Sequence, residues 1–286
     1  MCIFRNHKKT VKLRLGKKIR PYSEMEFKRV YDILDRLSWV RDREAQLIEL
    51  LYSLLQDERE RDLIEELLGK VIYLDDDDSR AKTREIANHI TNVWRCSEED
   101  TLIVGANKKE KADGSAVLLY GLRNVLGWKE SRLKLTCKNI QEIPDVKNVV
   151  IADDFTGSGQ RMHDIIGYVR TRLPDARVFF VSIGLMKSVV KRCYPNVLEY
   201  TYFAPIILTP GLNYANNKRT MLMTQIEEYL ASRWKSYSLE MYHLGYKESR
   251  ALYWNRQFRV PNNVFPVFWW GERKDGSIFH SLMGEQ

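Results

Sequence analysis

The sequence predicts an α/β fold in which helices flank a mostly parallel sheet, and three observations support this prediction. Between residues 79 and 203, segments of helical periodicity alternate with short, continuous apolar runs. One run, residues 149–152, leads into two adjacent acids and a glycine-containing loop that opens a helix. Amphipathic helical patterns precede the alternation, and a helix with an aromatic-rich tail follows it. Sheets of this kind bind ligands beyond the carboxyl ends of their strands.

Residues 1–20 are expected to form a basic arm. It contributes to the formal net charge of +8 through Lys8, Lys9, Lys12, Arg14, Lys17, Lys18 and Arg20. Phosphate contacts from such an arm would give salt-sensitive binding to nucleic acid. A solvated chain end is the alternative interpretation, because no DNA-reading motif accompanies the arm.

Residues 21–77 are expected to be helical. Ser23 and Glu26 form a capping box at the start of the first of three amphipathic patterns. Their apolar positions are Phe27, Val30, Tyr31, Leu34 and Leu37, then Leu47, Ile48, Leu51, Leu54 and Leu55, then Ile64, Leu67, Leu68 and Val71. Such helices must bury their apolar faces, so an N-terminal bundle is predicted that packs on the core or binds a partner. The acidic run 75–78 is interpreted as a loop and helix start.

Residues 78–212 are expected to form the α/β core, and residues 213–286 a C-terminal extension. Helices are predicted at 79–95, 115–126, 160–173 and around Val189 and Val190, with strands at 101–105, near 133–135, at 149–152, 178–183 and 197–203. The extension begins with a helix from Lys218 to Tyr242. Its later aromatic residues, Trp254, Phe258, Trp269 and Trp270, either stack on a ligand or belong to the core.

The acids and the loop after residue 152 predict a sugar-phosphate site. Asp153 and Asp154 are placed to accept hydrogen bonds from vicinal ribose hydroxyls or to hold a cation. Glycines in the loop allow close approach to an anion, which the start of the next helix favours. An acidic turn without a ligand is the alternative. A magnesium-dependent nucleotide triphosphatase is disfavoured, because the sequence contains no Gly-x-x-x-x-Gly-Lys-Ser/Thr motif.

Residues 149–161 resemble the phosphoribosyl pyrophosphate (PRPP) motif of type I phosphoribosyltransferases. The resemblance implies that Asp153 and Asp154 bind the ribose in a catalytic role. It implies that the 5′-phosphate binds to Thr156, Gly157, Ser158, Gly159 and Gln160. By its order in the fold, the loop after the first core strand corresponds to the pyrophosphate loop, with Asn107, Lys108, Lys109 and Ser115, although a solvated Lys-rich loop is the alternative. Mg²⁺ would bind mainly through the pyrophosphate and ribose, without a dedicated protein metal site.

A second resemblance involves the tail from Gly245 to Trp270 and the pair Gly114-Ser115. Both are similar to phosphoribosyltransferase-like proteins of bacterial conflict systems, including retron operons. This implies an antiviral defence effector or accessory protein that binds PRPP or another ribose phosphate, and a hood-like C-terminal extension that selects the acceptor. Glycosyl transfer is the expected activity. Whether it is retained stays open, because the connection 136–147, where the family has a closing loop, is short.

Two alternatives accompany this interpretation. One is a catalytically degenerate nucleotide-binding sensor, or a scaffold whose basic arm binds nucleic acid or a reverse-transcriptase complex. The other is an acid sugar kinase, a family that shares the string Ala-Asp-Asp-Phe-Thr-Gly but carries it near the amino terminus, whereas here it starts at Ala152.

A cytoplasmic location is expected, with no membrane partner. The sequence has no apolar run of about 18 residues and no apolar segment typical of a signal peptide near its start. Its four cysteines, Cys2, Cys96, Cys137 and Cys193, are far apart and are expected to be reduced thiols. An oligomer is compatible with the sequence.

Overall fold

The computed structural model describes residues 22–107, 114–138, 140–191, 201–215, 217–235, 238–271, 273–276 and 280–284. The predicted basic arm and the loop residues Lys108 and Lys109 lie outside these ranges. The chain divides into two compact units, Met1–Glu44 and Ala45–Gln286. The four-part division expected from the sequence stays a prediction.

The first unit contains helix α1 (Glu24–Arg36), followed by a 3-10 segment, η1 (Ser38–Arg43). The capping box is present: Glu26 N donates to Ser23 Oγ at 3.2 Å, and Ser23 N donates to Glu26 Oε2 at 2.8 Å. These bonds satisfy two of the backbone donors that a helix start leaves without partners, so α1 begins where the sequence predicts.

The second unit starts with helical segments. Helix α2 (Glu44–Glu49), at the boundary between the units, continues into a π-helical turn, η2 (Leu50–Leu54), and α3 (Glu58–Leu68) follows. Asp57 caps α3, and Leu63, Ile64, Leu67 and Leu68 are its buried side. These helices confirm the amphipathic patterns as local structure. The N-terminal bundle as an assembly stays a prediction.

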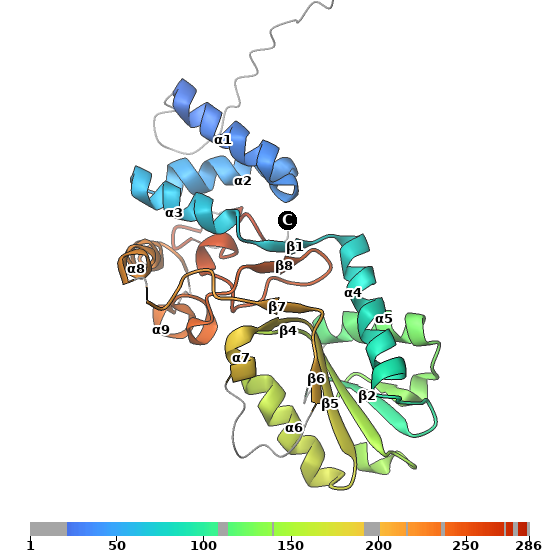
Figure 1. Ribbon diagram of the computed structural model, residues 1–286. Helices are drawn as coiled ribbons and strands as arrows, with labels where there is room; N and C mark the ends of the chain where they lie inside the picture. Colours follow the sequence, from blue (N-terminus) through green and yellow to red (C-terminus); the bar gives the residue numbers. More distant parts are fainter. Residues whose placement is uncertain are drawn as a thin grey trace, which may run out of the picture. The chain divides into compact units, whose positions relative to one another are not determined.

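The main sheet consists of parallel strands, which confirms the predicted fold class (Figure 1). They are β2 (Thr101–Gly105), β3 (Leu133–Lys134), β4 (Asn148–Thr156), β5 (Arg177–Met186), β6 (Thr201–Phe203) and β7 (Ile206–Leu208). Their order is β3-β2-β4-β5-β6, and β7 pairs with the end of β5. Nearly every residue of β2, β4 and β5 is buried. This pattern is expected of a parallel sheet with both faces covered.

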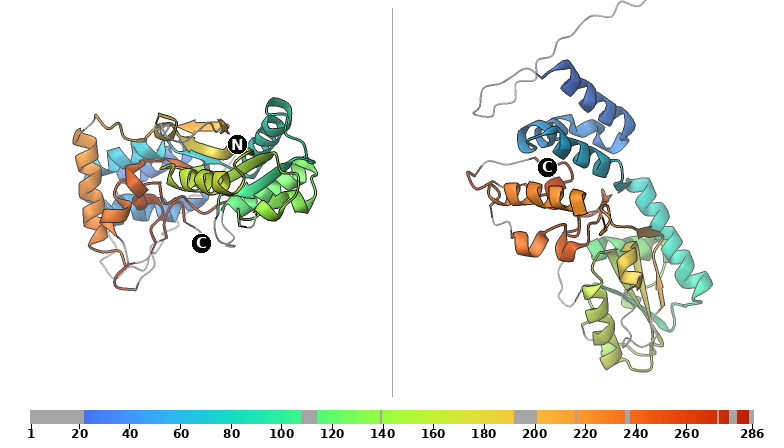
Figure 2. Two further views of the ribbon diagram at one scale, coloured as in Figure 1. Left: turned by 90° about the horizontal axis from the view of Figure 1, so that it is seen from below. Right: turned by 60° about the vertical axis from the view of Figure 1, so that its left-hand side comes forward.

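Helices cover the two faces of this sheet (Figures 1 and 2). One face carries α4 (Asp76–Asn88), which continues as the π-helical turn η3 (His89–Val93), and α5 (Gly114–Leu126). The other face carries α6 (Gln160–Arg172), and the short α7 (Lys187–Lys191) follows β5. The acidic run starts α4 as predicted, because Asp75 accepts a hydrogen bond from Asp78 N at 2.9 Å. Two 3-10 turns, η4 (Glu130–Arg132) and η5 (Ile140–Glu142), flank β3.

The C-terminal extension differs from the sequence prediction at two places. Its expected single helix is two helices, α8 (Asn217–Ala231) and α9 (Leu239–Tyr242). The chain leaves the helical path because Trp234 is buried and bridges to Arg273. The second difference is a small parallel sheet of β1 (Ile72–Leu74) and β8 (Tyr253–Asn255), neither of which the sequence indicated. Two 3-10 turns, η6 (Tyr246–Glu248) and η7 (Pro266–Phe268), complete the extension.

Two further expectations concern the cysteines and membrane-spanning helices. Cys96 and Cys137 are buried free thiols, in agreement with the sequence interpretation, whereas Cys2 and Cys193 lie outside the described residues. Within the part of the chain that the structure describes, no helix has the length and apolar character that crossing a bilayer requires.

Candidate functional site

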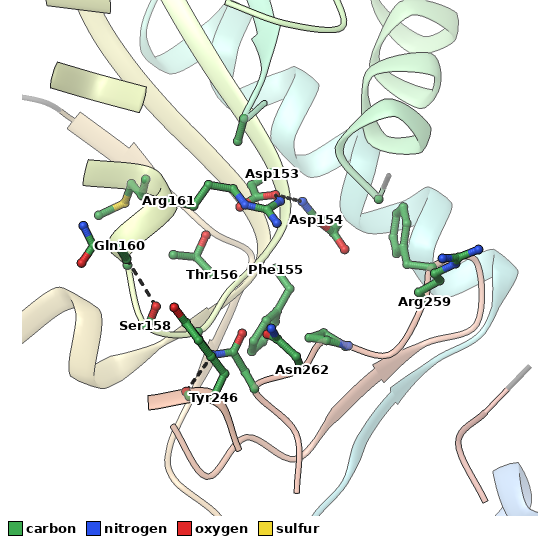
Figure 3. Close-up of a pocket in the computed structure, with 18 of the residues that line it drawn as sticks. Asp153, Asp154, Phe155, Thr156, Ser158, Gln160, Arg161, Tyr246, Arg259 and Asn262 are labelled. Atoms are coloured by element: carbon green, nitrogen blue, oxygen red, sulfur yellow. Dashed lines mark hydrogen bonds and ion pairs between the residues drawn. The ribbon is translucent and has the colours of Figure 1, made fainter. Parts of the chain in front are cut away.

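A cavity of about 850 Å³ lies at the carboxyl ends of β2 and β4 (Figure 3). Its walls come from the end of β2, the start of α5, the end of β4 with the loop into α6, and the C-terminal extension. After β2 the chain continues to β3 on one side, and after β4 it continues to β5 on the other. This point of divergence is where open α/β sheets leave a crevice for ligands.

The two acids occupy neighbouring positions in this cavity but different environments. Asp153 is 2% exposed, and its Oδ1 accepts a hydrogen bond from Asp154 N at 3.2 Å. The same oxygen pairs with Arg161 Nη1 at 3.4 Å, so a cation from the first turn of α6 compensates its charge (Figure 3). Asp154 is half-buried, and its carboxylate lies directly against Gly114, where a Cβ atom would overlap it. The glycine at the start of α5 therefore makes room for Asp154.

The loop between β4 and α6 has the geometry of an anion site. Gly159 caps α6 with φ +79°, a conformation that favours glycine. Gln160 N donates to Ser158 Oγ at 3.4 Å. Gly157 lies so close to the side-chain amide of Asn263 that a Cβ atom would overlap it. The loop is thus held between the sheet and the C-terminal extension, with the start of α6 directed at the cavity.

Thr156 lies at the junction of the strand and this loop. It lines the cavity, but its hydroxyl donates to Ser182 Oγ on β5 at 3.3 Å. In the structure, the Thr156 side chain therefore anchors the end of β4. Its predicted contact with a phosphate stays a prediction.

The predicted pyrophosphate loop is described only at its two ends. Asn107 lines the cavity, and its Nδ2 donates to Ser115 Oγ at 3.5 Å. Ser115 is fully buried and lies behind the cavity wall. The predicted contributors Lys108 and Lys109 are outside the described residues.

The C-terminal extension supplies the outer wall of the cavity, mostly through residues that the sequence did not indicate. Of its four candidate aromatic residues, Phe258 alone is among the residues that line the cavity. Trp269 and Trp270 instead donate to backbone oxygens of Val264 and Lys235, at 2.9 Å and 3.3 Å. The missed wall residues are Tyr246, Gln257, Arg259, Val260, Pro261, Asn262 and Asn263. The turn signal Pro-Asn-Asn was visible in the sequence, but nothing local showed where this turn would lie.

Hydrogen bonds fix this wall internally, and one of them joins it to the loop between β4 and α6. Tyr246 N donates to Asn262 O at 2.8 Å, and Asn263 Nδ2 donates to Tyr246 O at 3.3 Å. Lys247 Nζ donates to Gln160 Oε1 at 3.2 Å. The extension is therefore part of the site, and Phe155 stacks on its Tyr253 with ring centroids 4.8 Å apart. Burial raises the pKa of the Tyr253 hydroxyl, which stays protonated.

The side chains present are compatible with a magnesium ion that a ligand helps to hold. Mg²⁺ commonly binds through one or two carboxylates together with substrate phosphates. Asp153 and Asp154 are carboxylates on the cavity wall. Among the described residues, no group of three or more metal-ligating side chains occurs. Magnesium binding, mainly through the ligand's own oxygens, stays a prediction.

Two solved structures are similar to parts of this chain. One is the Helicobacter pylori xanthine-guanine-hypoxanthine phosphoribosyltransferase, at 15% identity and a TM-score of 0.34, covering 48% of this chain and 83% of that protein. The other is a hypothetical protein from Neisseria gonorrhoeae with bound ppGpp, at 14% identity and a TM-score of 0.34, covering 53% and 96%. No curated protein matches the chain.

The family resemblance predicted from the sequence is confirmed by a family model. The association with defence systems and retron operons stays a prediction. The model of the PRTase-CE family matches residues 45–283, which include nearly all of the second compact unit, and the chain therefore belongs to this family.

Proposed function

We propose that the chain binds PRPP or another ribose phosphate in this cavity and transfers or cleaves at the anomeric carbon, as a phosphoribosyltransferase-type glycosyltransferase. One observation carries the proposal: adjacent acids and a glycine loop that opens a helix line the same cavity at the point where the sheet order diverges. A volume of about 850 Å³ is sufficient for a ligand of this size.

The loop 156–160 would bind the 5′-phosphate. Backbone N–H groups at the start of α6 carry no intrahelical partner, and the helix dipole favours an anion there. The left-handed conformation of Gly159 permits the turn that aims these groups at the cavity. Ser158 adds a hydroxyl to the same side of the cavity.

Asp153 and Asp154 would accept hydrogen bonds from the ribose hydroxyls. Arg161 compensates the charge of the nearly buried Asp153, so the carboxylate keeps a fixed position without a ligand. In the reaction, the bond between the anomeric carbon and the leaving oxygen breaks while an acceptor, or water in cleavage, attacks that carbon. Positive charge that develops on the ribose is stabilised by the neighbouring carboxylates. Magnesium, when bound, would neutralise charge on the leaving group.

The proposed biological role is an effector or accessory protein of a bacterial antiviral defence system. It is supported by the similarity of the tail and of Gly114-Ser115 to conflict-system proteins. The structure adds that both segments line the cavity, Gly114 at the start of α5 and the tail as its outer wall.

The proposal is tested by calorimetric titration with PRPP and Mg²⁺. The native chain should bind, and Asp153→Asn/Asp154→Asn should lose that binding. The control is Asp32→Asn/Asp35→Asn, which makes the same change in charge on exposed positions of the other compact unit. Circular dichroism checks that each variant is folded. No binding by the native chain, or equal binding by the site variant, contradicts the proposal. Pyrophosphate release then separates a transferase from a sensor.

A further inference from the structure

Arg259 is a cation on the wall of the cavity, on the side away from the phosphate loop. In Figure 3, Asp153 and Asp154 lie between Gln160 on one side and Arg259 on the other. Arg161 is paired with Asp153, but Arg259 forms no hydrogen bond or ion pair with any residue in the described ranges. Within those ranges, none of its guanidinium donors is paired, and a guanidinium offers five of them.

The backbone that carries Arg259 is fixed by a buried polar network. Ser79 Oγ, on α4, accepts from Asn255 Nδ2 at 3.0 Å and donates to Gln257 Oε1 at 2.9 Å. Gln257 N donates to Asn255 Oδ1 at 3.1 Å, and Phe258 N donates to Asn255 O at 3.0 Å. Ser79 and Asn255 are almost completely buried, and Phe258 is 8% exposed. Arg259 therefore extends from a turn that is held in place before a ligand arrives, which lowers the entropic cost of binding.

The order of groups along the cavity suggests the class of ligand. An anion-binding loop is followed by two carboxylates and then by a guanidinium. The carboxylates suit sugar hydroxyls but repel a second anionic group next to the sugar. A cation beyond them offsets this repulsion, and a guanidinium binds phosphate oxygens in bidentate geometry.

We propose that Arg259 binds the anionic group attached at the anomeric side of the sugar, the pyrophosphate when the ligand is PRPP. The chain then selects sugars with an anionic group at both ends over sugars with one phosphate. This inference rests on the proposed function, since it assumes that the loop 156–160 holds the 5′-phosphate. Arg161 and Lys247 do not substitute for Arg259, because they contact Asp153 and Gln160.

The test compares PRPP with ribose 5-phosphate, which lacks the second anionic group. Both are titrated at one fixed Mg²⁺ concentration into the native chain, Arg259→Gln and Arg256→Gln. Arg256 is the matched control: it is exposed on the same segment, three positions earlier, and is not among the residues that line the cavity. Arg259→Gln should weaken PRPP binding about 10- to 100-fold, the value of a charge-assisted contact, and change ribose 5-phosphate binding less than about twofold. Arg256→Gln should change both less than about twofold.

Two results would overturn the inference while leaving the proposed function intact. One is PRPP binding by Arg259→Gln at native strength. The other is an equal loss of affinity for both ligands, which would mean that Arg259 acts through the overall electrostatic field of the cavity or through the stability of the fold. Failure of the native chain to bind either ligand is a different outcome, and it contradicts the proposed function itself. Arg259→Lys, which keeps the charge but not the planar fork, should recover part of the PRPP affinity.

Discussion

Glu227 should make the stability of this protein depend on pH in a specific direction. It lies on α8 and is completely buried. Its Oε2 accepts a hydrogen bond from Leu244 N at 2.8 Å, whereas its Oε1 has no partner in the described part of the chain. Burial raises the pKa of Glu227 to about 8, although the Leu244 N–H and the charge of Arg250 act in the opposite direction. The carboxyl is therefore protonated in the folded chain at neutral pH.

The direction of this pH dependence follows from proton linkage. An unfolded chain ionises Glu227 near the ordinary value of 4.5, while the folded chain holds the proton up to about pH 8. Between these values the folded state binds more protons, so the free energy of unfolding falls as pH rises. Each pKa unit corresponds to about 1.4 kcal/mol, and the interval of about 3.5 units gives a total loss of about 5 kcal/mol.

The variant Glu227→Gln isolates this effect. An amide has nearly the same shape, can accept the Leu244 hydrogen bond, and does not titrate. Both proteins are unfolded with urea at pH values from 5 to 9. The free energy of unfolding of Glu227→Gln minus that of the native chain should increase over this range by several kcal/mol, about 5 at most. Glu228→Gln is the control, because Glu228 is the adjacent residue on the same helix and is exposed. A difference between the native chain and Glu227→Gln that stays constant over this range would refute the reasoning.

Ionisation of Glu227 should also affect the candidate site, through the turn after Leu244. Leu244, Gly245 and Lys247 have φ of 52°, 79° and 55°, a left-handed conformation that is costly for residues other than glycine. This turn places Tyr246 on the cavity wall and Lys247 on Gln160. Its first backbone donor is fixed by Glu227. Ionisation strengthens this one hydrogen bond, but it leaves a buried charge that is relieved only when the turn moves and admits water. High pH should therefore weaken the support of the cavity wall.

Three further substitutions test packing in the α/β core and its cavity. Gly157→Ala places a Cβ atom on the Asn263 amide, so it should destabilise the fold by about 1–3 kcal/mol and weaken ribose 5-phosphate binding. Gly167→Ala on α6 has open space and should stabilise by about 0.5–1 kcal/mol; equal melting temperatures for the two variants would contradict this contrast. Ser79→Ala removes the hydroxyl shared by two buried amide side chains and should cost about 1–3 kcal/mol in urea unfolding. An unchanged unfolding midpoint would show that the network does not stabilise the cavity wall.

Features that depend on neighbouring residues in the chain were predictable. The capping box at Ser23, the acidic start of α4, and the strand, acids and glycine loop of residues 148–160 all appear where the sequence placed them. Caps, glycine turns and continuous apolar runs act over a few residues, so their energetic preferences are present in the local sequence. These local features were sufficient to indicate the fold class and the family.

The tertiary structure alone decided the outer wall of the site. Residues 72–74 pair with residues 253–255, which are far away in the sequence. This pairing, together with the Ser79 network, places Phe258 and Arg259 at the cavity. The break between α8 and α9 has a similar origin, because burial of Trp234 overrides a helical pattern. Pairing and burial between distant segments depend on which surfaces meet after folding. The sequence therefore determined the motif of adjacent acids and a glycine loop, while long-range packing decided which side chains complete its cavity.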